Sequence, residues 1–208
     1  MIRVITIERE YGSGGGEIAE KIAERLGWKL WDQMLTQEIA RRMDCECYAV
    51  EKHEERSDPV YYRLLKAFMR GSHEGSQNAP RMKMLDTECV REVAQKLMPE
   101  IAKAGNCVIV GRGSAYYLCS RPDAFHVFIY APFHERVRRL QAKGKSVKQA
   151  EELAETVDRD RADFIKRYFN VEWPGRHCFH LMVNSGMGDE VAVEIILDAV
   201  ARYTKQRT

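Results

Sequence analysis

The chain has 208 residues, 45% of them hydrophobic, so it can bury one good core together with a smaller inserted lobe. Its 33 Lys and Arg residues nearly balance its 31 Asp and Glu residues, and a net charge of +2 excludes any argument from global charge for a nucleic-acid or membrane partner. The sequence shows no signal-peptide pattern and no apolar run of membrane-spanning length, so we expect a cytoplasmic protein.

The first predicted elements are a strand, a glycine-rich turn and a helix. The apolar run Ile2–Ile7 is typical of a buried parallel strand. From Glu17 onward, apolar residues recur every four positions, which predicts an amphipathic helix. Glycines let the intervening turn aim successive N–H groups at one point, where the helix adds its positive end. We therefore predict a phosphate-binding loop made of Gly12, Ser13, Gly14, Gly15, Gly16 and Glu17.

This loop lacks the cation of the usual phosphate loop, G-x-x-x-x-G-K-[ST]. If Gly14 is the second motif glycine, Gly15 stands in the lysine place and Gly16 in the hydroxyl place. Sliding the motif forward puts Glu17 in the lysine place instead. Two alternatives stay open here: a turn used only for packing, and a dinucleotide loop in which Asp32 is the acidic residue after the second strand.

Four further apolar runs predict strands, and helical patterns separate them. This alternation favours an α/β fold, with a parallel sheet covered by helices on both faces. The predicted strands are Lys29–Trp31, Cys107–Val110, Phe125–Tyr130 and Phe179–Val183.

Capping residues and apolar periodicity predict the helices. Ser146 and Gln149 form a capping box that starts a helix over Val147–Phe169, and Pro132 suits the first turn of a helix that ends near Gln141. Residues 44–59 and 71–80 break the periodicity, so we predict an insert between the second and third strands that covers a substrate. The other apolar faces are Val60, Leu64 and Phe68; Val90, Val93, Leu97 and Ile101; and Val191, Ile195, Ala199 and Tyr203.

Polar residues follow two strands at the carboxyl edge, where open α/β sheets bind ligands. Arg112 lies in the turn after Cys107–Val110, and Asp32 ends the second strand. A surface guanidinium paired with a carboxylate is the alternative interpretation of Arg112. A planar pair of donors beside glycines favours contact with a phosphate.

A charged segment precedes the last strand and contains Arg159, Arg161, Lys166 and Arg167. Such a segment is also typical of a solvated helix face with ion pairs one turn apart. Its position between the fourth and fifth strands favours a basic helix that folds over a polyphosphate and supplies transition-state charge. The basic stretch 136–145 has no interleaved aromatic residues, so we interpret it as a solvated face rather than a nucleic-acid site.

The six cysteines are scattered along the chain. Neither Cys45 and Cys47 with His53, nor Cys178 between two histidines, has the spacing of a structural zinc site. We interpret the cysteines as free thiols, mostly buried, and predict no metal ligand among the side chains.

These segments together resemble the cytidylate kinase-like family, relatives of bacterial cytidylate kinase among the P-loop nucleoside monophosphate kinases. The resemblance covers nearly the whole chain, and the order and spacing of its pieces make it specific. The last basic place of the family's R-D-x-x-D-x-x-R lid motif is Lys166. The pieces are ITIEREYGSGG with GEIAEKIAERLG, KLWDQ, CVIVGRGSAYYL, DAFHVFIYAPFHERVRRL, RDRADFIK and HLMVNSG.

The resemblance implies a three-layer α/β/α P-loop fold with a five-stranded parallel sheet in the order 2-3-1-4-5. It implies one domain, with a core at 1–43 and 86–208, a helical acceptor-binding insert at about 44–85 and a lid at about 144–175. The implied reaction uses ATP and Mg²⁺ and moves the γ-phosphoryl group to a CMP- or dCMP-like nucleoside monophosphate. A homo-oligomer is compatible with this family. The implied residues are Gly12 to Gly16 for the donor phosphates, Asp32 and Arg112 for the acceptor, and Arg159, Asp160, Asp163 and Lys166 in the lid.

Three positions depart from the family pattern. Gly15 replaces the lysine, Gly16 replaces a basic residue that often follows, and Gly113 replaces the Asp of the G-R-D motif, which weakens the case for cytidine. The alternative function is therefore a nucleotide-binding module that has lost turnover and acts through a partner. We expect the missing charge to come from Arg9, which a short turn holds near the loop, or from the lid arginines and Lys166.

Overall fold

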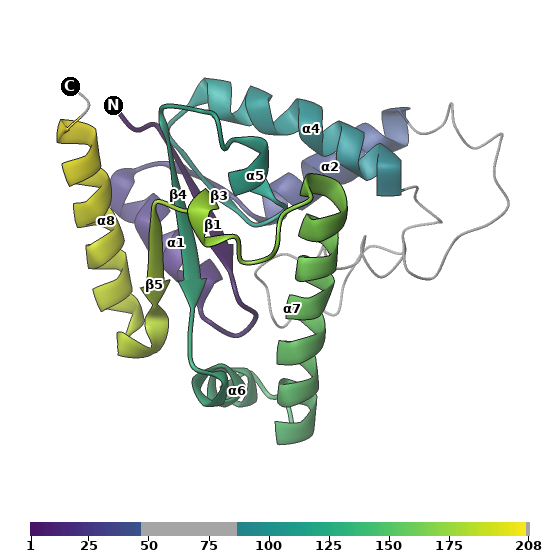
Figure 1. Cartoon of the computed structure of the whole chain (residues 1–208), viewed down its shortest axis with the longest axis vertical. Helices are drawn as coiled ribbons and strands as arrows, with labels where there is room; N and C mark the ends of the chain where they lie inside the picture. The colour runs from purple at the N-terminus through teal and green to yellow at the C-terminus, as the bar shows by residue number, and fades with distance from the viewer. Residues whose placement is uncertain (47–86, 207–208) are drawn as a thin grey trace, which may run out of the picture.

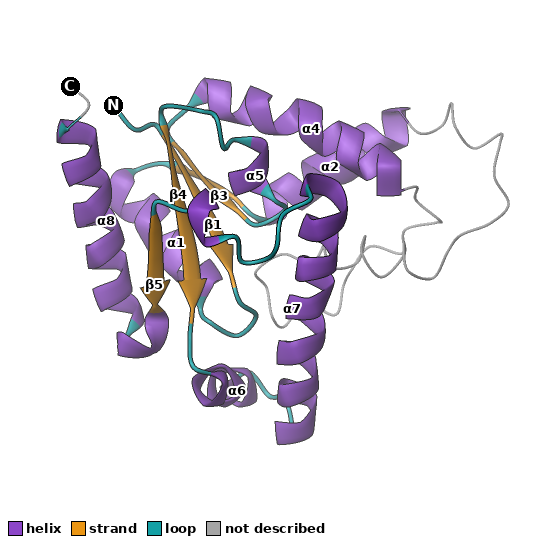
Figure 2. Cartoon of the chain, viewed as in Figure 1, coloured by secondary structure: helices purple, strands orange, loops and turns teal. Residues whose placement is uncertain are grey.

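The computed structural model describes residues 1–46 and 87–206, which form a parallel five-stranded sheet between two layers of helices (Figures 1 and 2). The strand order is β2-β3-β1-β4-β5, so the predicted α/β fold and the implied order are confirmed. The strands are β1 (Val4–Arg9), β2 (Lys29–Trp31), β3 (Cys107–Val110), β4 (Ala124–Tyr130) and β5 (Leu181–Asn184).

Two apolar clusters hold the layers together. Helices α1 (Gly15–Leu26) and α8 (Asp189–Lys205) cover one face of the sheet, and α2 (Gln33–Glu46), α4 (Thr87–Ala104), α5 (Ser114–Tyr117) and the end of α7 (Val147–Phe169) cover the other. Helix α6 (Phe133–Ala142) lies beyond the carboxyl ends of the strands and packs on α7 (Figure 1). Short 3₁₀ turns η2 (Arg176–Cys178) and η3 (Ser185–Met187) flank β5.

Strand β1 is central, because it pairs with both β3 and β4, and every one of its residues is buried. A strand covered on both faces needs an apolar run rather than an alternating pattern, which explains the sequence signal. The strands are parallel, so the turns after β1, β3 and β4 all lie at the same edge of the sheet, and α6 lies beyond the end of β4 (Figure 2). Ligand chemistry is expected at that edge.

Several predicted boundaries need correction. Strand β1 extends to Arg9, and α1 begins at Gly15, two residues before the predicted start. Helix α2 was not predicted, because few apolar residues beyond Leu35 and Ile39 mark its buried side. The insert expected at about 44–85 lies almost entirely outside the described residues and stays a prediction; α2 continues to Glu46. The predicted Val60 helix and the loop 71–80 lie outside the described residues.

The predicted face of the last helix is partly wrong. Val191 and Ile195 are 43% and 38% exposed, and α8 instead buries Ala192, Val193, Ile196 and Val200. This helix is apolar on more than one side, so packing against α1 and β5, not the pattern, selects its buried face. Pro132 was predicted in the first turn of α6 and lies one residue earlier, at its N-cap. The predicted capping box is confirmed, because Ser146 and Gln149 make both of its bonds at the start of α7.

The prediction of mostly buried thiols is wrong for the described side chains. Cys107 is buried, but Cys119 is exposed and Cys178 is half-buried. Burial raises the pKa of Cys107 to about 11, so this thiol stays protonated. Across residues 1–46 and 87–206, no helix combines the length and the apolar character needed to span a membrane.

A buried histidine in β4 makes the stability of this fold sensitive to acid. His126 is 2% exposed, and its Nδ1 lies 2.7 Å from the Thr6 hydroxyl on β1. Burial, followed by the charge of the neighbouring His180, lowers the pKa of His126 to about 4. Between pH 6.5 and about 4 the unfolded chain therefore binds a proton that the folded chain excludes, so the stability present above pH 6.5 is lost as the pH falls.

We expect this histidine to account for about 3 kcal/mol of unfolding free energy between pH 7 and pH 4. Urea titrations of the wild type and His126→Asn test this, since asparagine keeps an acceptor for Thr6 and cannot titrate. The variant should lose most of the slope. His134→Asn is the control, because the His134 side chain is 79% exposed. Equal slopes in all three proteins would contradict the assignment.

Candidate functional site

The glycine loop joins β1 to α1 at the carboxyl edge of the sheet. Gly14 caps α1 with a φ of 77°, and Gly12 has a φ of 82°, which are left-handed conformations that glycine adopts without strain. Gly15 begins the helix, so the first-turn N–H groups have no partners within the helix. The predicted turn between strand and helix is therefore present, with the start of α1 at its end, and its binding of an anion stays a prediction.

Contacts from the end of β5 hold the loop in place. The hydroxyl of Ser185 in η3 donates to the carbonyl of Ser13 at 2.6 Å. Ser13 is fully buried, and its own hydroxyl donates to the carbonyl of Glu10 at 2.8 Å. Ser13 therefore closes the turn from within, and it is a structural member of the loop as well as a predicted binding residue.

Helix α7 clasps the other side of the same loop. Asp158 accepts a hydrogen bond from the backbone N–H of Tyr11 at 2.8 Å. Arg161 donates to the carbonyl of Arg9 at 2.8 Å and to Asp158 at 3.2 Å. Burial raises the pKa of Asp158, while the charges of Arg161 and Arg136 oppose the shift. The predicted lid helix thus lies against the loop, and Arg161 is the predicted lid cation that contacts it.

Arg9 runs from the glycine loop to the turn after β3. Its side chain starts beside Gly15, since a Cβ built on Gly15 would lie 2.7 Å from the Arg9 Cβ. Its guanidinium ends beside Gly111, where an added Cβ would collide with Nη1. Arg9 is only 5% exposed. A buried cation therefore lies between the two glycine turns at the sheet edge.

Glu8 places a carboxylate among these guanidinium groups. It is 4% exposed, and one of its oxygens, Oε1, is buried without a hydrogen-bond partner. Burial raises the pKa of Glu8, and the charges of Arg9, Arg161 and Arg112 only partly offset this effect. Glu8 thus offsets part of the positive charge of the three arginines near it, Arg9, Arg161 and Arg112.

The two residues predicted to face the acceptor bind each other. Arg112 donates to Asp32 with 2.7 Å between Nη1 and Oδ1, and their side chains are 1% and 11% exposed. Arg112 also donates to the carbonyl of Val110 and to the hydroxyl of Thr36 on α2. Opposite charges at the ends of adjacent strands attract strongly in this buried place. The carboxylate alternative for Arg112 is therefore realised, but in the interior rather than on the surface.

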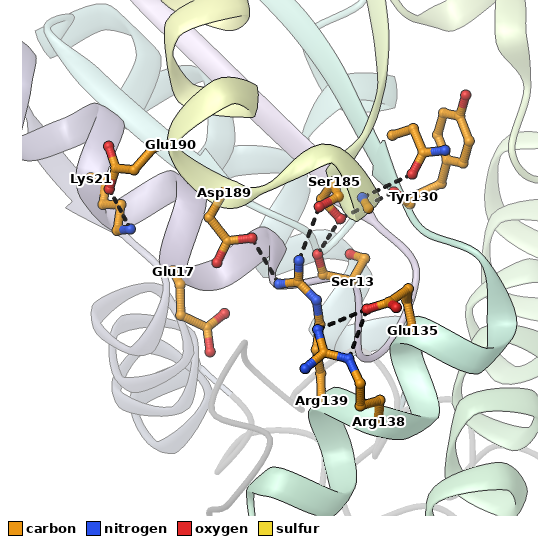
Figure 3. A network of polar contacts seen from close by, with 12 residues as sticks. Ser13, Glu17, Lys21, Tyr130, Glu135, Arg138, Arg139, Ser185, Asp189 and Glu190 are labelled. Atoms are coloured by element: carbon orange, nitrogen blue, oxygen red, sulfur yellow. Dashed lines mark hydrogen bonds and ion pairs between the residues drawn. The ribbon is translucent and has the colours of Figure 1, made fainter.

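Helix α6 brings side chains to the loop that we interpreted as a solvated face. Arg139 donates to Asp189 at 2.8 Å and to the carbonyl of Ser185 at 3.0 Å, beside Ser13 (Figure 3). A Cβ on Gly14 would collide with its Nη1. One turn later, Lys143 pairs with Glu17 in the first turn of α1. One face of α6 therefore serves the loop, while Arg138 points away and pairs with Glu135.

Glu17 keeps its negative charge in this setting. Burial alone would raise its pKa, but the hydrogen bond from Lys143 and the backbone N–H of Glu17 itself outweigh burial and leave the pKa below its usual value. Its second oxygen, Oε2, is buried and accepts no hydrogen bond. An anionic side chain thus sits at the mouth of the predicted anion site.

The remaining predicted lid cations are exposed side chains. Arg159, Lys166 and Arg167 are exposed along α7, and Lys166 pairs with Glu172. Asp160 is buried on the same helix. Of the lid residues, the structure therefore brings Arg161 to the loop and leaves these three cations on the surface.

Sequence reasoning missed neighbours of the loop that come from other parts of the chain. Asp158, Ser185 and Arg139 each contact the loop from more than 120 residues away in sequence. The position of α6 could have been predicted from the sequence. A helix that follows β4 directly must begin at the carboxyl edge of the sheet, where the loop lies. Its basic residues at 136, 139 and 143 share one face by helical spacing.

Comparisons with known proteins agree with this architecture. The model of the cytidylate kinase-like family matches residues 4–187. Cytidylate kinases of Methanosarcina mazei and Methanosarcina acetivorans are 27% and 29% identical over 82 and 66 residues, which cover 38% and 31% of this chain. The matched segments span 46% and 37% of those relatives, less than half of their length.

Solved structures show the same fold. A crystal structure of an uncharacterized protein from Eubacterium ventriosum has a TM-score of 0.70 at 19% identity, covering 97% of this chain and 99% of that one. Shikimate kinase from Acinetobacter baumannii has a TM-score of 0.52 at 14% identity, covering 97% and 94%.

Proposed function

Because the chain belongs to the cytidylate kinase-like family, we propose that it is a phosphotransferase that moves the γ-phosphoryl group of ATP to a nucleoside monophosphate, with a CMP-like acceptor. Phosphoryl transfer needs positioning and neutralisation of charge more than covalent chemistry. A rigid anion loop with cations around it meets that need.

One observation carries the proposal: the buried Arg9 side chain spans from Gly15 in the donor loop to Gly111 in the turn after β3. In this proposal the donor phosphates bind the backbone of Gly12–Glu17, and the acceptor lies toward Asp32 and Arg112. Arg9 and Arg161 then supply charge between the two substrates, and Arg159, Lys166 and Arg167 are further lid cations. The phosphoryl group would cross the place where the guanidinium lies.

The position that reads the base in the family, Gly113 in this chain, differs from the family pattern. Gly113 stands where the family has aspartate, with a φ of 69°, and a Cβ there would lie 3.0 Å from the ring of Phe169. The Phe169 ring thus fills the space that an aspartate side chain would need. Any preference for cytidine must therefore come from other residues.

A coupled assay of ADP release tests the proposal, with ATP, Mg²⁺ and a panel of ribo- and deoxyribonucleoside monophosphates. ADP formation that depends on one acceptor, CMP or dCMP first, would support it. The alternative function is nucleotide binding without turnover, which the glycine in the lysine place favours. Saturable ATP binding with no ADP formation for any acceptor would support that alternative.

The residues around the loop fit a Mg²⁺ ion that accompanies ATP. In the described part of the chain, no cluster of three or more His, Cys, Asp or Glu side chains could hold a metal alone. The sequence predicted no metal ligand among the side chains, but Glu17 is now the candidate partner, because its Oε2 is buried without a hydrogen bond and carboxylate oxygens suit Mg²⁺. The ion would neutralise charge on the phosphates when bound.

Replacing Glu17 by Gln should therefore tighten ATP binding without the metal and reduce the affinity that Mg²⁺ adds. In EDTA, loss of a negative charge at the loop should tighten ATP binding about fivefold. With Mg²⁺, the wild type should gain affinity and the variant should gain less. Calorimetry on both proteins checks this, with Glu20→Gln as control, since Glu20 is exposed on the same helix. Identical behaviour of the two variants would contradict a metal role for Glu17.

A further inference from the structure

The structure fixes how the loop aligns with the phosphate-loop motif. Gly14 caps α1 and Gly15 is its first residue, so Gly14 takes the second motif glycine and Gly15 the lysine place. The first motif glycine then falls five residues earlier, on Arg9. This chain therefore has glycine where the motif has a cation, and a cation where the motif has glycine.

The presence of Arg9 in the place of the first motif glycine and that of Gly15 in the place of the lysine depend on each other sterically. A Cβ on Gly15 would lie 2.7 Å from the Cβ and 2.9 Å from the Cγ of Arg9, closer than real Cβ atoms approach their neighbours. A side chain at position 15 and the present side chain at position 9 therefore exclude each other. Gly15 provides the room through which Arg9 passes, and the family departure at position 15 has a physical partner at position 9.

We propose that the loop cation has been exchanged between positions 15 and 9, so that Arg9 performs from the strand end the phosphate binding that the motif lysine performs from the helix. This inference rests on the proposed function. Arg9 would bind the transferring phosphoryl group directly, and a planar guanidinium can donate two parallel hydrogen bonds to it.

The surroundings of Arg9 hold its charge in one place. Its carbonyl accepts the hydrogen bond from Arg161, and Glu8 precedes it in the strand. Beyond Gly15, the buried Arg9 side chain extends to Gly111, in the turn where we place the acceptor. The motif lysine reaches the γ-phosphate from the helix, whereas Arg9 would reach the same phosphoryl group from the strand end, on the side of the acceptor turn, where charge develops during transfer.

Reciprocal variants test the exchange through turnover, ATP affinity and thermal unfolding. Arg9→Ala should lower kcat by about 10²–10³-fold, as loss of a positioned donor does. Gly15→Lys alone should be impaired, because its side chain meets Arg9. The double variant Arg9→Gly with Gly15→Lys rebuilds the motif, and its kcat should exceed that of Arg9→Gly at least tenfold. Arg138→Ala is the charge-matched control on exposed surface, expected to match the wild type.

Two results would overturn the exchange while leaving the kinase proposal intact: wild-type turnover in Arg9→Ala, or a double variant no more active than Arg9→Gly. Arg9→Lys keeps the test decisive if the double variant unfolds, since it keeps the charge and should retain more activity than Arg9→Ala. A wild type that neither binds ATP nor releases ADP would overturn the proposed function, and this inference with it. If the wild type binds ATP without turnover, equal ATP affinity in Arg9→Ala would overturn the exchange.

Discussion

Replacing Arg112 by Met is expected to lower the free energy of unfolding by about 3–5 kcal/mol, the usual cost of breaking a buried ion pair from one side. The substitution leaves the Asp32 carboxylate in an interior place without its partner, and it removes the hydrogen bonds to Val110 and Thr36. Three elements meet at this guanidinium, namely β2, β3 and α2. Urea denaturation at pH 7 measures the loss.

A double-mutant cycle separates the contribution of the Arg112–Asp32 ion pair to stability from the contribution of side-chain packing. Asp32→Asn with Arg112→Met should be less destabilised than the sum of the single variants, because neither charge is then left alone. Arg138→Met is the matched control, since the exposed pair with Glu135 should contribute less than about 1 kcal/mol. A stability of Arg112→Met within 1 kcal/mol of the wild type would show that Arg112 does not pair with Asp32 in solution.

The fold could be predicted from the sequence because its signals are local. The runs at β1, β3 and β4 are buried on both faces and therefore read as continuous apolar segments. The capping box at Ser146 and the glycines before α1 specify helix starts through contacts only a few residues long. Such patterns need no knowledge of distant neighbours.

The site could be predicted only in part, because its side chains meet across the fold. Sequence position brought Arg112 and Asp32 to the correct edge, but not to each other. Arg161 is one of four cations predicted for the lid helix, and nothing in the sequence separates it, the one that contacts the loop, from the exposed Arg159. Arg139 was treated as solvated, since the helix orientation that turns it to Gly14 depends on packing against α7.

The direction of the Arg9 side chain could not be predicted from the sequence either, although the sequence predicts Arg9 as a cation of the site. Glycine at positions 15 and 111 reads as turn chemistry in the sequence, and only the folded chain shows that both glycines also clear the way for one side chain. Gly15 and Gly111 are 96 positions apart in the sequence, and both contact the side chain of Arg9. A local sequence pattern cannot predict such a shared contact. Position 111 therefore offers a test of the site that leaves Arg9 itself unchanged.

Gly111→Ala is expected to reduce phosphoryl transfer about 10²-fold while the protein remains folded. A Cβ at this position would collide with Nη1 of Arg9, and the guanidinium, as the end of a flexible side chain, must move away. The residue also has a φ of 67°, so alanine adds backbone strain of about 1–2 kcal/mol. The measured quantities are kcat in the ADP-release assay and the free energy of unfolding.

The control variant Gly27→Ala separates the effect of backbone strain from the effect of displacing the Arg9 guanidinium. Gly27 has a φ of 63°, nearly that of Gly111, but a Cβ there meets nothing within 4 Å. Both variants should therefore lose similar stability, since they share the same strained backbone region. Only Gly111→Ala should lose turnover, because only there does the added methyl group displace a cation from between the two glycine turns. Equal turnover in the two variants would mean that the position of the Arg9 guanidinium does not matter for the reaction.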